Sequence, residues 1–247
     1  FLIIQVILLV YMVYEVNDWL TRRDDALAWT LLIGGSVIFW CLGLALIGIC
    51  YHFYAASPSC HLNIFFITWS LIVGLILAAL LFVPNRMESA GLLTSGAVFL
   101  YCSYLLTSAL TSEPTQDILQ CIRGSGNSPY WISAVGFFLA LGAVSYQTID
   151  AGSSSHDMFG IRPKEGDNET LLPYRADFFH FIFVLASMYV AMLFSNWEVS
   201  PSTTAFQLDR GWISTWVKMG SKWACEVVYG WSVIAPAIFR NRDFSGV

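Results

Sequence analysis

The stretch WVKMGSKWACEVVYGW, residues 216–231, has the tryptophan and apolar content of a membrane-spanning helix. It nevertheless carries three full charges, on Lys218, Lys222 and Glu226. Each charge would cost roughly 2.5–3.5 kcal/mol at the centre of a bilayer. Because the three residues are spaced at i, i+4 and i+8, they share one face of a helix. We therefore expect that face to point into a helix bundle and away from lipid.

The charged face has two interpretations. In the first, Lys222 and Glu226 pair along the helix and form a structural contact that fixes how the helices pack. In the second, the face lines a polar crevice that accommodates a lipid headgroup or a small polar solute. Lys218 lies nearer the start of the helix, so its ammonium can also extend toward the membrane surface.

The composition of the whole chain agrees with a membrane environment. Hydrophobic residues make up 57% of the 247 residues and charged residues only 12%, whereas about 25% of an ordinary soluble domain is charged. A polytopic membrane protein accounts for this balance. The net charge of −5 gives no indication of a nucleic-acid partner. The chain opens at Phe1 inside an apolar run, so we expect a further segment of the protein to precede it.

We predict an all-α, polytopic transmembrane helix bundle with about seven spans in this chain, each near the ~20 residues that a span needs. The predicted spans cover about residues 1–19, 27–54, 62–83, 91–112, 130–149, 177–197 and 211–239. Lysine and arginine gather in alternate connectors, which predicts that those connectors are cytosolic. The polar loop 150–175 and the carboxyl terminus belong to this cytosolic side.

Two cysteines lie in connectors on the opposite, extracytosolic side, where disulfides are permitted. A bridge between Cys60 and Cys121 is one expectation. The alternative is two free thiols, or bonds to cysteines in another part of the protein. No Cys/His spacing resembles a zinc site, and we expect no metal and no cofactor.

Hydroxyl groups and one histidine are further candidates for polar contacts inside the spans. Ser103, Thr107 and Thr111 are four residues apart and share one helix face. They either bond to their own helix or to a neighbouring helix, or line a hydrophilic groove. His180 lies near one end of the predicted span 177–197. It is either an interhelical hydrogen-bonding residue or part of the same groove.

Four stretches of the chain resemble the serine incorporator family, also called the TMS membrane protein family. They are YLLTSALTSEP (104–114), FFHFIFVLASMYVAMLFSNW (178–197), WISTWVKMGSKW (212–223) and VIAPAIFRNRDF (233–244). The resemblance implies a bundle of about ten membrane helices, of which this chain is the carboxyl-terminal half or slightly more. Lys218 falls in the family's WVK pattern. Lys222 and Glu226 stand at positions where animal members of the family have small or apolar residues. This difference implies that the chain resembles a plant-like or other distant branch of the family.

The resemblance implies a multi-pass protein of an endomembrane or the plasma membrane that handles phospholipids. The implied roles are incorporation of serine into phosphatidylserine and sphingolipids, and ATP-independent phospholipid scrambling. We expect no enzyme, because the chain has no nucleophile elbow, phosphate-binding loop or HExxH motif. The alternative is a non-catalytic scaffold or a structural subunit, whose partners would be lipid-biosynthetic enzymes, other membrane subunits or a second copy of the chain.

Overall fold

The computed structural model describes the chain in separate segments, the longest of which contain the helices. The described residues are 2–23, 25–55, 57–58, 60–84, 87, 89–114, 121, 142, 145–146, 176–194 and 211–239. Within these ranges the regular structure is α-helical, which confirms the predicted all-α fold. The helices are α1 (Leu2–Thr21), α2 (Ala26–Tyr54), α3 (His61–Leu80), α4 (Leu92–Ser112), α8 (Ala176–Phe194) and α9 (Trp212–Ile238).

Three of the described helices, α2, α3 and α4, are long and apolar enough to cross a membrane. They match three of the predicted spans. Helices α1, α8 and α9 form where three further spans are predicted. Most of the predicted span 130–149 and all of the loop 150–175 lie outside the described residues. The part of the chain that the structure describes is therefore all-helical and contains three candidate spans, and seven spans remain a prediction.

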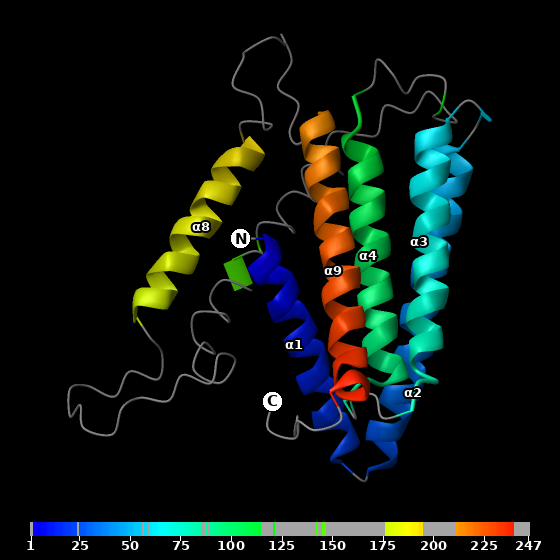
Figure 1. The fold of residues 1–247 in the computed structure, drawn as a ribbon, viewed down its shortest axis with the longest axis vertical. Coiled ribbons are helices and arrows are strands. Elements are labelled where there is room, and N and C mark those ends of the chain that lie inside the picture. Colours follow the sequence, from blue (N-terminus) through cyan, green and yellow to red (C-terminus); the bar gives the residue numbers. More distant parts are fainter. Residues whose placement is uncertain are drawn as a thin grey trace.

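Helix α4 lies at the centre of a five-helix group (Figure 1) and packs against α1, α2, α3 and α9. Its neighbours bury 56% of its most apolar stretch, compared with 17% for α2. Helix α2 instead exposes large apolar side chains such as Leu27, Leu31 and Ile33, as expected for a helix whose outer face contacts lipid. Helix α8 stands to one side of the five-helix group.

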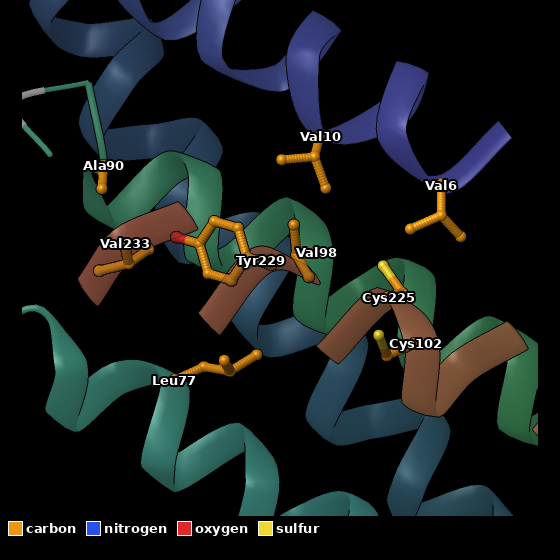
Figure 2. Close-up of a cluster of buried hydrophobic side chains, with 9 residues drawn as sticks. All are labelled: Val6, Val10, Leu77, Ala90, Val98, Cys102, Cys225, Tyr229 and Val233. Carbon is orange, nitrogen blue, oxygen red and sulfur yellow. The ribbon is translucent and has the colours of Figure 1, made fainter. Parts of the chain in front are cut away.

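The core on the α1 side of α4 joins helices that are distant in the sequence (Figure 2). Its buried members are Val6, Val10, Leu77, Ala90, Val98, Cys102, Cys225, Tyr229 and Val233. They come from α1, α3, α4, α9 and the connector before α4. This core fixes one face of α9 against α4, and that face carries the charged residues of the opening stretch.

Candidate functional site: a polar column between α4 and α9

Helix α9 carries polar side chains along the face that it turns toward the bundle. Thr215, Lys222, Glu226 and Tyr229 are all buried, and Lys218 is partly buried. Their spacing of three or four residues keeps them on one side of a helix with 3.6 residues per turn. We call these five residues, together with Ser232 and their polar partners on α1 and α4, the polar column.

At its first end, the column is attached to the last turn of α4. The backbone N–H of Gly211 donates to the carbonyl oxygen of Ser112 at 2.8 Å. One turn further along α9, the Thr215 hydroxyl donates to the carbonyl oxygen of Ala109 at 3.3 Å. These bonds satisfy carbonyl groups that the end of α4 leaves without helical partners.

Lys218 contributes the strongest polar contact at this end of the column. Its ammonium donates to the Ser112 hydroxyl at 2.5 Å and to the Ser108 carbonyl oxygen at 3.3 Å. Hydrogen bonds from a charged donor are roughly twice as strong as neutral ones. Lys218 therefore joins α9 to α4, as expected for a charged face that points into the bundle.

The middle of the column is the ion pair between Lys222 and Glu226. The Lys222 ammonium donates to Oε1 of Glu226. Lys222 is 0% exposed and Glu226 is 9% exposed, so both charges are shielded from lipid and from water. The structure thus shows the inward-facing i, i+4 pair that the spacing predicts. Removal of either partner would destabilise the fold, because the remaining charge would be buried without compensation.

At its second end, the column continues through hydroxyl groups of three helices. The hydroxyls of Tyr229 and Thr94 lie 3.2 Å apart, and those of Ser232 and Tyr14 lie 2.7 Å apart. From Thr215 to Ser232 the column extends about 26 Å along α9, at about 1.5 Å per residue. This length approaches the ~30 Å thickness of the hydrocarbon core of a bilayer.

The three hydroxyl groups of α4 that the sequence identifies as candidates for polar contacts bond mainly to their own helix. Ser103, Thr107 and Thr111 donate to the carbonyl oxygens of residues 99, 103 and 108, respectively. Thr107 also contacts the Cys50 thiol of α2 at 3.3 Å, and Thr111 is exposed. These bonds favour the expectation of hydroxyls bonded within and between helices. The groups of α4 that contact Lys218 are on Ser108 and Ser112 instead.

His180 is not brought together with the column. It is exposed on α8, which stands apart from α4 and α9 in Figure 1. Among the described residues, no group of three or more His, Cys, Asp or Glu side chains is placed to hold a metal ion.

Cys60 and Cys121 are joined by a disulfide, and their Cα atoms lie 5.8 Å apart. This distance is within the usual range of about 4.4–6.8 Å. Cys60 directly precedes α3, so the bond ties the start of that helix to the connector that follows α4.

Sequence reasoning missed Glu113, which follows the last residue of α4. Its side chain is 3% exposed, and its Oε1 has no hydrogen-bond partner among the described residues. Burial raises the pKa of this carboxyl to about 7, although a hydrogen bond from Asn63 opposes the shift. The carboxyl therefore changes charge near neutral pH.

The same reasoning missed the hydroxyl end of the column. The spacing from Glu226 to Tyr229 continues the polar face and could have identified Tyr229. Tyr14 and Thr94 carry no such pattern, because their roles depend on which helices become neighbours. Ser112 was likewise hidden, since its contact with Lys218 joins residues 106 positions apart.

Comparison with known proteins gives consistent matches along the chain. The family model of the serine incorporators (Serinc) matches residues 1–169 and 161–242. Serine incorporator 2 of Mus musculus is 30% identical over 283 residues, covering 99% of this chain and 62% of the relative. Serine incorporator 3 of Bos taurus is 27% identical over 304 residues, covering 99% of this chain and 64% of the relative. The chain therefore spans less than two thirds of the length of these relatives.

Proposed function

Because the chain belongs to the serine incorporator family, we propose that it handles membrane phospholipids without catalysing a covalent reaction. In this proposal, lipid headgroups move between the two leaflets along the polar column while the acyl chains stay in the bilayer. No ATP is required, because the lipids move down their own concentration gradient.

The observation that carries the proposal is the succession of polar contacts along one face of α9. Its polar contacts follow one another from Thr215 to Ser232, over about 26 Å of helix. A charged headgroup in hydrocarbon loses its hydration, which is the main obstacle to its crossing. Hydroxyls and an ion pair along the route can replace part of that hydration.

The chemistry of the ion pair suits a phospholipid headgroup. The Lys222 ammonium can bind a phosphate, and the Glu226 carboxylate can bind the amine of a zwitterionic lipid. Lys222 is fully buried in this conformation, so the column is closed between α4 and α9. Lipid movement therefore requires these helices to separate, as in transitions in which packed elements slide or rotate.

A second candidate function is delivery of serine to lipid synthesis, since the relatives are named serine incorporators. Free serine carries an ammonium and a carboxylate, and these groups complement Glu226 and Lys222. A third candidate is a non-catalytic scaffold that positions lipid-biosynthetic enzymes or other membrane subunits.

A reconstitution experiment separates the candidates. The chain is placed in liposomes that contain a fluorescent phospholipid, and an impermeant reductant bleaches the outer leaflet in the absence of ATP. We expect bleaching to extend to the inner-leaflet lipid, and to do so more slowly in the double variant Lys222→Leu with Glu226→Leu. Thr30→Val is the matched control, because Thr30 is exposed on α2 and donates to Ala26 of its own helix.

The outcomes assign the function. Bleaching confined to the outer leaflet, with uptake of labelled serine into the same liposomes, would favour serine delivery. If neither lipid nor serine moves, the scaffold becomes the better candidate. If the folded double variant scrambles lipid as fast as the wild type, the ion pair has a structural role and is not part of the lipid route.

A further inference from the structure

Two free cysteines meet at the centre of the α4–α9 interface. Cys102 is the middle residue of α4 (Leu92–Ser112), and Cys225 is the middle residue of α9 (Trp212–Ile238). Figure 2 shows the two side chains next to one another between the two helices, within one cluster of buried residues. Both cysteines are free and buried. Neither residue is needed for the lipid route proposed above.

The thiols are remote from both aqueous compartments. Cys102 is 3% exposed and Cys225 is 0% exposed. Each lies about ten residues or more from the ends of its helix, which corresponds to roughly 15 Å or more along the helix axis. Water-soluble thiols and disulfide exchange enzymes cannot easily reach this depth, whereas small or lipid-soluble molecules can.

The Lys222–Glu226 ion pair lies beside the thiols. Glu226 follows Cys225 directly in the chain and Lys222 precedes it by three residues, so the buried ion pair and Cys225 share one face of α9. A carboxylate can accept a proton and an ammonium can donate one, so groups for moving protons are present where the sulfur atoms meet.

We propose that Cys102 and Cys225 are a redox-sensitive pair that hydroperoxides convert into a disulfide, which fixes α4 against α9. Lipid hydroperoxides and hydrogen peroxide share the O–O bond that this reaction requires. The lipid-derived source is favoured because the pair lies at the depth of the acyl chains.

The reaction has two balanced steps. In the first, one cysteine gives up its thiol proton and its sulfur attacks the terminal oxygen of the hydroperoxide ROOH; the O–O bond breaks and the leaving alkoxide takes up the proton, so that a sulfenic acid and the alcohol ROH form. In the second, the other thiol sulfur attacks the sulfenic sulfur, the S–O bond breaks, and the disulfide and water form. The two thiols lose two electrons in total, and the hydroperoxide gains them.

The test uses the wild-type chain in lipid nanodiscs, so it does not depend on a variant that folds. Samples are treated with cumene hydroperoxide, with hydrogen peroxide or with buffer. They are then denatured, alkylated and digested without reduction. We expect a linked Cys102–Cys225 peptide, together with loss of both alkylated thiols, at a lower concentration of cumene hydroperoxide than of hydrogen peroxide.

Cys50 and the existing disulfide provide internal controls. Cys50 is also buried, but among the described residues its thiol contacts the Thr107 hydroxyl and no second thiol is bonded to it, so it should remain alkylatable under conditions that link the pair. The Cys60–Cys121 peptide should be recovered in every sample. In Cys102→Ser, Cys225 should yield no linked peptide with a partner inside the chain.

Two results would overturn the proposal. One is the absence of the linked peptide while Cys102 and Cys225 stay alkylatable. The other is oxidation of either cysteine no faster than Cys50, or only to unlinked acids. A reductant added after denaturation should release both thiols. Where the lipid assay above shows scrambling, oxidation should slow it. The expected slowing rests on the proposed function, but detection of the linked peptide does not.

Discussion

The ring of Phe99 on α4 occupies the space beside Gly74 on α3, where an added Cβ atom would lie 2.3 Å from Cε2 of the ring. On α2, a Cβ atom at Gly43 would lie 2.6 Å from Cδ1 of the same ring. Phe99 is itself 3% exposed. The two glycines therefore let one aromatic side chain hold three helices together.

This packing predicts that Gly43→Ala and Gly74→Ala destabilise the bundle. The new methyl group would overlap the Phe99 ring, and overpacking of a core costs about 1–3 kcal/mol. Gly48→Ala is the matched control on α2, because nothing lies within 4 Å of its added Cβ. Thermal unfolding in detergent measures the difference. If Gly43→Ala and Gly48→Ala changed the unfolding temperature equally, the Phe99 ring would move aside without a loss of stability.

The disulfide gives a second prediction. Cys60 and Cys121 are 61 residues apart in the sequence, and a cross-link of this kind typically stabilises a protein by about 2–4 kcal/mol. We expect reduction, or the double change Cys60→Ser with Cys121→Ser, to lower the unfolding temperature. Cys41→Ser, which alters an exposed free cysteine, should not. Alkylation before and after reduction should differ by two thiols, and an unchanged count would contradict the bond.

Glu113 predicts a dependence of stability on pH. It lies beyond the end of α4, and burial raises its pKa from an ordinary value of 4.5 to about 7. The folded state therefore holds this proton more tightly than the unfolded state does. The resulting stabilisation is fully present below pH 4.5 and is lost as the pH rises through about 7.

The measurement compares the wild type with Glu113→Gln across that interval. The glutamine cannot ionise, so the variant should gain stability relative to the wild type as the pH is raised. Taking the difference between the two proteins cancels other groups that titrate over the same range. A difference that is constant with pH would show that Glu113 has the same pKa in the folded and unfolded states.

The all-helical character of the described residues was predictable from the sequence because lipid requires long apolar helices, and their composition is visible without a structure. The pairing of Lys222 with Glu226 was predictable for a similar reason, since both lie on one helix at a spacing that brings them together. Lys218 was less predictable. Its partner Ser112 lies on α4, and only the packing of α4 against α9 brings the two side chains into contact.

Thr107 and His180 were identified as candidates from the sequence, but the sequence did not show which helices would lie next to them. The spacing of Ser103, Thr107 and Thr111 correctly indicates a shared face, but spacing alone does not identify the helix that the face meets. The structure places Thr107 against Cys50 of α2. His180 lies on α8, whose position beside the five-helix group (Figure 1) has no counterpart in a local sequence pattern.

The ion pair gives the last prediction, which concerns stability and is independent of lipid transport. Lys222→Leu leaves the Glu226 charge buried without its partner, and Glu226→Leu does the same to Lys222. Removing one member of a buried pair typically costs about 3–5 kcal/mol. The double variant leaves no charge in the interface, so we expect it to be more stable than either single variant.

A double-mutant cycle measures this coupling directly, from the unfolding free energies of the wild type, the two single variants and the double variant in one detergent. Lys218→Met serves as a comparison, because it removes a partly buried ammonium whose described partners on α4 are neutral oxygens. Its loss should add to that of the double variant, since Lys218 and Lys222 contact different partners. If the effects of Lys222→Leu and Glu226→Leu were simply additive, the two charges would not stabilise one another, and the ion pair could not explain why α9 tolerates them.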